Sequence, residues 1–576
     1  MTGITSLPPE ILAHILSYLP RKQDKLREQE EQEAQVEPVE QYGQPGQDKQ
    51  GEHPHNQDTR CGLCEQDKFD SDLTKRSSEL PVYLPSYSTV CKTWHQQVEL
   101  QTFREIDVMS SELEYLSKIM TESRRSALRV MNYSIVMSKD VEMACAKGKE
   151  FTGEVEEVVE KALTAAITEL FVRLQEWEDE NPLISLSMMI TNIYTYNDGQ
   201  REKATRCREQ WNSIEKDMFN PYSRLLQLGS LDDLPKLKSV ARLQVGSGNL
   251  HMTEDSMTRL AMKFPTLKAL DLQIGHMTWY AEGNNWGREL VPELRYRFAL
   301  SLLPLASLPL TRFSIYCLDE SMAHYSHYQA PPSVLHCAAP NIDCLSLAFY
   351  AISIIPTMKE MEIINFIVSP QLFLPPAIIP LGSEFAYLAK TIPQWPSLME
   401  YTIRFSAIRP SGSWYFVRHP DDPLPYDFEI PIPDSLDYHK EFRTFPDNRA
   451  MNEMFGAAGK AKREMPALQA LYIFAGMGNE LEFEATWCKS GDLYRADHHG
   501  IRIAMEQLGM SKKAFLAGDR VYCSTATGRD WRPTREIENT WASGGNQAWF
   551  KRFRHLEDAL KEGTVFSAGY RADIST

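Results

Sequence analysis

Two short motifs hold residue types that could act in catalysis or bind phosphate. Asp497-His498-His499 contains adjacent histidines, but successive residues point in different directions on a regular element, so one metal ion would not use both imidazoles. GAAGKA at 456–461 looks like a phosphate loop, yet its glycines are too close and Ala follows Lys460 where Ser or Thr is needed. Because GxSxG, HExxH and a GxGxxG after a strand are also missing, we predict no catalytic residues and no cofactor.

Four further side chains carry the ligand atoms of a tetrahedral zinc site, namely His53, His55, Cys61 and Cys64. Structural zinc usually takes two properly spaced ligand pairs, whereas here one CxxC follows a His-x-His. We therefore interpret these residues as part of a solvated linker and predict no metal.

Two aromatic-rich excursions, at 276–287 and 411–428, combine exposed-looking rings with turn-forming residues. Aromatic side chains dominate binding hot spots, so these excursions are candidate contacts for a protein target. The alternative is that the rings anchor each loop to its own core, as Trp and Tyr often do. The candidate target-binding residues are Trp279, Tyr280, Trp286, Trp414 and Tyr415.

Charge and composition narrow the partners and the compartment. The net charge of -17 disfavours general binding to phosphate backbones and anionic membranes, so we expect neither nucleic acid nor membrane as a partner. The most apolar stretch, residues 363–381, is interrupted by prolines that would break a membrane helix. Ten scattered cysteines and no secretory signal predict a reduced protein of the cytoplasm or nucleus.

Two separated fragments, SLPPEILAHILSYLP at 6–20 and STVCKTWHQQVE at 88–99, each predict a short amphipathic helix. Pro8 and Pro9 suit a first helical turn, and Ile11, Ile15 and Leu19 recur on one face of the helix that follows. In the second fragment, Val90 and Trp94 are four residues apart and share a face. An alternative to a joint module is a plain amphipathic helix that begins a globular domain.

Taken in order, the two fragments resemble an F-box, a three-helix module that binds a Skp-type adaptor and, through it, a cullin and RING ubiquitin ligase. The resemblance implies a split F-box-like module at 1–20 and 80–100. It departs from the family at residues 21–79, a polar insert rich in Gln and Glu that we expect to be disordered. By this resemblance, the adaptor-binding residues are Leu7, Pro8, Ile11, Ile15, Leu16, Leu19, Val90 and Trp94.

Alternating strand and helix patterns follow the second fragment and define a first α/β segment at 101–220. We expect strands near 103–109 and 127–137, and a third at 183–193. Between them, apolar residues hold one face of a helix over about 154–179.

A proline-led repeat characterises residues 221–490. In FPTLKALDL, APNIDCLSL, WPSLMEYTI and MPALQALYI, apolar residues stand two, five and seven positions after the proline. The last two positions alternate as in a strand, which predicts an outward side chain at position three: Lys268, Asp343 or Gln469. LPLTRFSIY is one residue shorter, and LPKLKSVARLQV is looser.

Stacked helix-strand units of this kind resemble degenerate leucine-rich repeats, with residues 491–576 as a C-terminal cap. The alternative is an ordinary α/β domain whose buried strands happen to follow prolines. With the F-box-like module, the fold class is α+β: three N-terminal helices followed by an irregular α/β solenoid.

From residue 88 to about 570, the chain is similar to a large fungal family of F-box-like proteins whose C-terminal region has no assigned activity. That resemblance implies a non-catalytic substrate adaptor, whose N-terminal helices bind the Skp-type adaptor while the solenoid binds an unknown protein target. The first alternative is an interaction scaffold that works outside a ligase. The second is an enzyme with an unrecognised C-terminal site.

Overall fold

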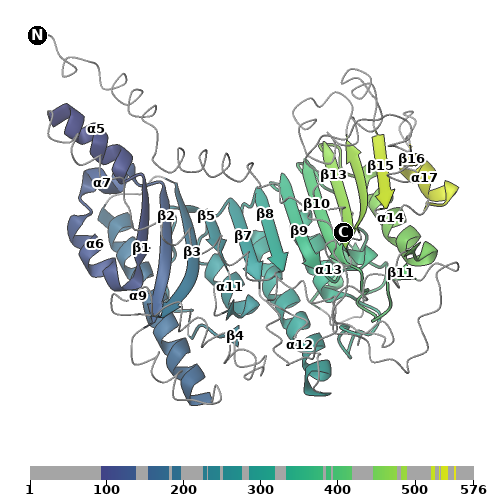
Figure 1. Cartoon of the computed structure of the whole chain (residues 1–576), viewed down its shortest axis with the longest axis horizontal. Coiled ribbons are helices and arrows are strands. Elements are labelled where there is room, and N and C mark those ends of the chain that lie inside the picture. Colours follow the sequence, from purple (N-terminus) through teal and green to yellow (C-terminus); the bar gives the residue numbers. More distant parts are fainter. Residues whose placement is uncertain are drawn as a thin grey trace, which may run out of the picture. The chain divides into compact units, whose positions relative to one another are not determined.

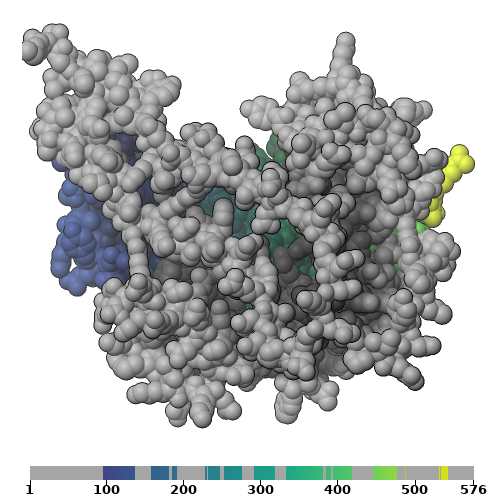
Figure 2. Space-filling model, viewed as in Figure 1, coloured from purple at the N-terminus to yellow at the C-terminus, as the bar shows by residue number. Residues whose placement is uncertain are grey.

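A computed structural model gives the arrangement of the chain (Figure 1), and Figure 2 colours the same residues in a space-filling view. The first predicted helix and the whole polar insert lie outside the residues that it describes, as do most residues of the predicted C-terminal cap. The structure describes residues 92–137, 153–180, 185–195, 225–229, 231–246, 251–274, 285–317, 333–379, 384–390, 394–417, 445–476, 482–488, 520–525, 531, 533–541 and 550–552.

The chain divides into two compact units. The first unit holds the described residues up to Asp107 together with Lys118–Met131, and the second holds Val108–Ser117 and the described residues from Asn132 onward. Strands β1 (Glu105–Met109) and β2 (Val130–Met137) and helix α6 (Leu113–Ile119) contribute residues to both, and the short 3-10 helix η3 (Ser110–Glu112) precedes α6.

Two helices lie wholly within the described part of the first unit. Helix α5 (Lys92–Thr102) matches the helix predicted from the second fragment, and α7 (Glu122–Ala127) packs against it. Arg124 links them, because its Nε donates to Glu99 Oε1 at 3.1 Å while its guanidinium lies 4.6 Å from the Phe103 ring centre.

The second unit is built on a largely parallel sheet. Its strands follow the order β3-β5-β7-β8-β9-β10-β13-β14-β15-β16 and pair in parallel from β3 to β13; β14 then runs antiparallel to both of its neighbours. The strand bounds are β3 (Leu186–Thr195), β5 (Val240–Val245), β7 (Ala269–Ile274), β8 (Arg312–Cys317), β9 (Glu360–Phe366), β10 (Glu400–Ser406), β13 (Ala470–Gly476), β14 (Glu482–Cys488), β15 (Arg520–Thr525) and β16 (Phe550–Arg552). Two small two-stranded sheets accompany it, β4 (Leu225–Leu226) with β6 (His251–Met252) and β11 (Phe416–Val417) with β12 (Phe445–Pro446).

Helical segments precede the strands and supply the residues that cover one sheet face. The segments are α9 (Gly153–Glu180), α11 (Glu254–Ala261), α12 (Asn285–Leu302), α13 (Cys344–Ser353), α14 (Asn448–Arg463), α17 (Arg535–Trp541) and the 3-10 turns η6 (Leu303–Ser307), η8 (Pro370–Leu372) and η9 (Ala386–Lys390). Along the sheet, α11, α12 and α13 follow one another in the order of the strands (Figure 1). None of the helices in the described ranges has the length and apolar character needed to cross a bilayer.

The first predicted elements are confirmed. Strands β1, β2 and β3 overlap the three strands expected between residues 103 and 193, and α9 spans the expected helix. Every third or fourth residue of α9 from Val159 to Trp177 is buried, so its apolar face does pack against the rest of the unit. The fold is therefore mixed α/β around a parallel sheet.

Pro265, Pro356 and Pro466 each occupy the second position of a turn that leads into a strand. Leu267 N–H donates to Phe264 O at 3.0 Å across Pro265, and Met358 N–H donates to Ile355 O at 2.9 Å across Pro356. Proline suits this position because its fixed φ matches the turn. The proline thus directs the chain from helix to strand as well as ending the helix.

In the repeat, the apolar positions two and five residues after the proline are three residues apart, whereas a regular strand would space buried residues by two. A repeated hydrogen-bond pattern, in which one carbonyl accepts from two successive N–H groups of the next strand, explains this spacing. Lys268 O accepts from Thr311 N at 2.7 Å and from Arg312 N at 3.0 Å, and Thr311 O accepts from Lys359 N and Glu360 N in the same way. Two residues then oppose one on the neighbouring strand, as in a β-bulge. Both side chains between the buried positions can therefore face away from the helices.

One predicted strand is wrong, and one copy of the repeat was missed. Pro340 makes the same turn, with Ile342 N–H donating to Ala339 O at 3.0 Å, but the residues after it form helix α13 instead of a strand. All ten residues of α13 are buried, and a continuous apolar run does not distinguish a buried helix from a buried strand. The strand of this unit is β9, where Met358, Met361 and Ile363 stand two, five and seven residues after Pro356 and are buried.

Candidate functional site

The described residues include only part of the site predicted from sequence. Trp94 lies in α5 and Trp286 lies in α12, but their side chains fall outside the described set. The zinc candidates His53, His55, Cys61 and Cys64 and the pair His498-His499 fall outside it as well. The other predicted contacts outside the described residues are Leu7, Pro8, Ile11, Ile15, Leu16, Leu19, Val90, Trp279 and Tyr280.

Tyr415 was expected to contact a target, and the structure corrects this. Its side chain is 0% exposed, its ring packs edge-on against Phe405, and its hydroxyl donates to Val368 O at 2.8 Å. Burial raises the pKa of this phenol, so it remains a neutral hydrogen-bond donor. A fully enclosed ring offers a partner no surface, and Tyr415 instead anchors its loop to the core.

Trp414 is half-buried against an apolar cluster of Val291, Val334, Ile367 and Ile408. It also forms an isolated antiparallel bridge with Ile408, which closes the turn between them. Gly412 has a φ of 81° in that turn, a conformation that favours glycine. The loop is therefore held in place on both sides of the turn. This fits the alternative interpretation from the sequence, in which aromatic rings anchor the loop to its own core.

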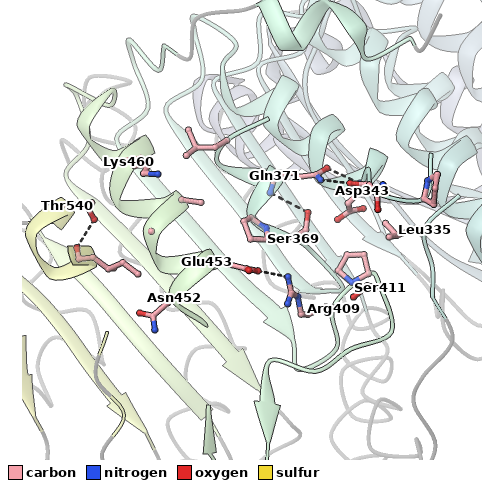
Figure 3. A pocket seen from close by; sticks show the side chains of 18 of the residues that line it. Leu335, Asp343, Ser369, Gln371, Arg409, Ser411, Asn452, Glu453, Lys460 and Thr540 are labelled. Carbon is pink, nitrogen blue, oxygen red and sulfur yellow. Dashed lines mark hydrogen bonds and ion pairs between the residues drawn. The ribbon is translucent and has the colours of Figure 1, made fainter. Parts of the chain in front are cut away.

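Holding this loop places Arg409 opposite α14. Its Nη2 lies 2.7 Å from Glu453 Oε2, and the guanidinium carbon lies 5.6 Å from the Tyr415 ring centre. The two charged side chains are 24% and 38% exposed, so the pair stands at the surface and contributes little stability by itself. Figure 3 shows the two side chains pointing toward one another, and both line a groove.

The groove has a volume of about 650 Å³ and lies beyond the carboxyl ends of β9 and β10. Its walls come from the start of α13, from η8, from the Arg409 turn, from α14 and from α17 (Figure 3). Leu335, Leu374 and Ile537 supply apolar surface, while Lys460 adds a positive charge. Open α/β sheets often bind ligands beyond their carboxyl strand ends, which makes this groove a candidate recognition site.

A buried ion pair supports the α13 wall of the groove. Arg295 Nη2 lies 2.8 Å from Asp343 Oδ1, and the two side chains are 7% and 1% exposed. Asp343 also accepts from Ser346 Oγ, while its backbone N–H donates to Gln371 Oε1 at 2.9 Å. The pair is satisfied by several hydrogen bonds, as a buried charge must be.

The sequence prediction that Asp343 points outward is therefore wrong. It directly precedes ten buried residues of α13, and an Asp before such a run is a signal for a helix start that could have been recognised from the sequence. Its partner Arg295 lies 48 positions earlier, and no local pattern indicates that contact.

Cys344, the first residue of α13, carries a thiol of low reactivity. Burial, followed by the nearby Asp343 charge, raises its pKa to about 12. Thiolates are the reactive form of cysteine, so burial favours the neutral, less reactive thiol at this position.

The outer face of the sheet carries a line of alternating charges. Arg242 Nη2 lies 2.8 Å from Asp271 Oδ2, Arg312 Nε lies 3.5 Å from Asp271 Oδ1, and Arg312 Nη1 lies 3.7 Å from Glu360 Oε2. Burial alternates along β7 and β8, so these side chains project from the face opposite the helices. Arg242, Arg312 and Glu360 are 43–49% exposed and reach solvent.

Both surfaces offer polar groups for recognition. Among the described residues, no group of three or more His, Cys, Asp or Glu side chains is placed to hold a metal ion. No protein-family model matches the chain, and no curated protein is significantly similar to it.

Proposed function

We propose that this chain is a non-catalytic, F-box-type substrate adaptor of a cullin and RING ubiquitin ligase. Its N-terminal helices would bind a Skp-type adaptor, and its α/β region would bind the protein to be ubiquitinated. The two roles rest on different parts of the chain.

Support for the adaptor-binding role comes from sequence order and from one helix. The Leu-Pro-x-Glu-Ile start at residues 7–11, its apolar stripe and the later Val90–Trp94 pair stand in the order that F-boxes have. Helix α5 begins at Lys92 and carries Trp94, as the second fragment predicts. A short helix with few buried residues of its own needs a partner, either within its module or from another chain.

The observation that carries the target-binding role is the outer face of the parallel sheet. A sheet with helices on one face and exposed charged side chains on the other presents a broad binding surface, while its buried core stays on the face that the helices cover. Arg242, Arg312 and Glu360 are charged side chains of this exposed kind, because each is close to half exposed. The groove beside α14 adds a concave site into which a target side chain could insert.

Such a protein accelerates a reaction through proximity alone. If one end is tethered to the ligase and the other holds a target, the effective concentration of the target lysine near the activated ubiquitin rises into the range typical of linked modules. No residue of this chain then needs to take part in bond making.

The adaptor contact is tested by placing a charge in the first apolar stripe. We expect Leu7→Ala, Pro8→Ala and Ile15→Asp together to abolish co-purification of the Skp-type adaptor, because a carboxylate would be buried in an apolar contact. Val158→Asp is the matched control, since Val158 is 41% exposed on α9. Circular dichroism checks folding; undiminished adaptor recovery with the folded triple variant would refute the assignment.

A further inference from the structure

Four neighbouring strands each have a basic residue at or beside their start. Arg242 stands near the start of β5 and Arg312 begins β8, while Lys268 and Lys359 immediately precede β7 and β9. Arg242 and Arg312 both pair in register with Ala269, which places all three in one row. Lys268 and Lys359 are both hydrogen-bonded to Thr311, one position before that row.

The repeated bulge explains how lysines and arginines at successive positions share one side of the sheet. Leu267 and Leu270 are fully buried, so the two residues between them, Lys268 and Ala269, are both excluded from the core. The same holds for Lys359 and Glu360 between the buried Met358 and Met361. We call Arg242, Lys268, Arg312 and Lys359 the cationic strip.

The strip has an excess of accessible positive charge. Its two arginines share Asp271, which is only 14% exposed and is therefore shielded by them. Within the described part of the chain, Lys268 and Lys359 are exposed and form no ion pair. Among the residues that the structure describes, Glu360 is the one exposed carboxylate that pairs with a strip residue, and its partner is Arg312. The local excess stands out on a chain whose net charge is -17.

We propose that the cationic strip binds an acidic peptide segment, rich in Asp and Glu, that belongs to the target protein. This inference rests on the proposed function, for which it supplies the chemistry of the target contact. Adjacent strands lie about 4.8 Å apart, so four strands span roughly 14 Å, the length of about four extended residues. The segment would cross the strands, with its carboxylates beside the arginine guanidinium groups and the lysine ammonium groups.

Charge distinguishes this occupant from nucleic acid. The strip is short and its arginines pair with Asp271 and Glu360, two carboxylates that would repel a continuous phosphate backbone. A peptide can place its carboxylates at the four cations and neutral residues near those two carboxylates. The overall acidity of the chain also disfavours long polyanions.

The test measures binding of a fluorescent decapeptide of alternating Glu and Ala to the purified full chain by anisotropy. A decapeptide with Gln in place of Glu is the neutral probe. We expect the Glu peptide to bind at low salt and the Gln peptide not to bind. Raising the ionic strength to about 0.5 M should weaken binding on the order of tenfold, because exposed charges are screened.

Charge reversal locates the site. We expect Lys268→Glu with Lys359→Glu to weaken binding by at least about tenfold, since each contact becomes repulsive. The matched control, Lys161→Glu with Lys390→Glu, makes the same change in net charge at exposed residues elsewhere and should remain within about threefold of the parent. Thermal unfolding confirms that both variants are folded.

Four results would overturn the proposed role of the cationic strip: no binding of the Glu peptide to the parent chain, equal loss of binding in both double variants, equal binding of the Gln peptide, or stronger binding of single-stranded nucleic acid than of the Glu peptide. Co-purification of the Skp-type adaptor is measured on the same strip variant and should be retained. If the adaptor is retained but the Glu peptide does not bind the parent chain, the strip is refuted while the proposed ligase role stands.

Discussion

Asp343 is the residue whose environment departs most from its sequence pattern. In a strand with one solvated face it would be an exposed carboxylate that tolerates replacement. In the structure it is 1% exposed and paired with Arg295, so its removal leaves a buried guanidinium without its counter-ion. Long-range packing decides its role, because the arginine comes from another helix.

Asp343→Ala should lower the free energy of unfolding by about 3 to 5 kcal/mol, the usual cost of breaking a buried ion pair from one side. Urea denaturation of the parent and the variant measures this. Replacing both partners, Arg295→Met with Asp343→Leu, should cost less than the single change because no charge stays buried. A loss within about 0.5 kcal/mol for Asp343→Ala, typical of surface positions, would contradict the buried pair.

Glu254 predicts a pH dependence of stability. It is a buried residue in the first turn of α11, and burial is the main cause that raises its pKa from 4.5 to about 7. The unfolded chain releases this proton near pH 4.5, whereas the folded protein retains it to about pH 7. The stability that the protonated carboxyl contributes is therefore fully present below pH 4.5 and is lost as pH rises through 7.

The glutamine of the Glu254→Gln variant cannot ionise, so the variant should not lose stability at this position as the pH rises from 4.5 to 7. Relative to the parent, the variant should gain up to about 3 kcal/mol between pH 4.5 and 8, since each unit of pKa shift corresponds to about 1.4 kcal/mol. Denaturant midpoints at the two pH values give the difference. A parent-to-variant difference that is constant with pH would exclude a raised Glu254 pKa.

Among the elements, the proline-led unit was predictable because its signals are local. The proline of the turn, the alternation of the strand and the buried positions all lie within nine residues. Together they place β7, β10 and β13 correctly. The copy that became α13 shares the turn and the apolar offsets, so those signals alone could not separate helix from strand. The unit's actual strand, β9, follows only sixteen residues later, from Pro340 to Pro356.

The repeat register predicts a contrast between inward and outward positions. Leu270→Ala and Leu471→Ala should each destabilise by about 2 to 5 kcal/mol, because each removes a fully buried strand side chain and leaves a cavity. Leu345→Ala should cost as much, although Leu345 is buried on helix α13 and does not test the strand register. Lys268→Ala and Gln469→Ala should cost roughly 0.5 kcal/mol or less, as these side chains are not in the core. A thermal-unfolding series in which outward and inward changes are equally damaging would mean that the register is wrong.

Two glycines of α14, one helical turn apart, should respond oppositely to the same substitution. A Cβ at Gly456 would lie 3.7 Å from Ile537 Cδ1, so Gly456→Ala should stabilise by about 0.5 to 1 kcal/mol through lower backbone entropy. At Gly459 a Cβ would lie 2.7 Å from Thr540 Oγ1 and 2.8 Å from Trp541 Nε1, so Gly459→Ala should destabilise by about 1 to 3 kcal/mol. Differential scanning calorimetry measures both; changes of the same sign would contradict the close approach of α17 to α14.

The sequence predicted more of the fold than of the groove and the cationic strip. Periodicity identified α9 and most of the strands because the burial of one face imposes a regular spacing. The groove was not predicted, because its walls come from segments up to about two hundred residues apart, from Leu335 to Thr540. The cationic strip likewise depends on which strands are neighbours, and sequence spacing does not state that order.

Affinity purification of the tagged full chain, followed by identification and quantification of the proteins that accompany it, tests whether the chain is a substrate adaptor. A substrate adaptor should be recovered together with a Skp-type adaptor and a cullin in comparable amounts. Recovery of the adaptor without a cullin would instead favour an interaction scaffold that works outside a ligase. Recovery of neither, with a chain that unfolds cooperatively and is therefore folded, would contradict the adaptor function.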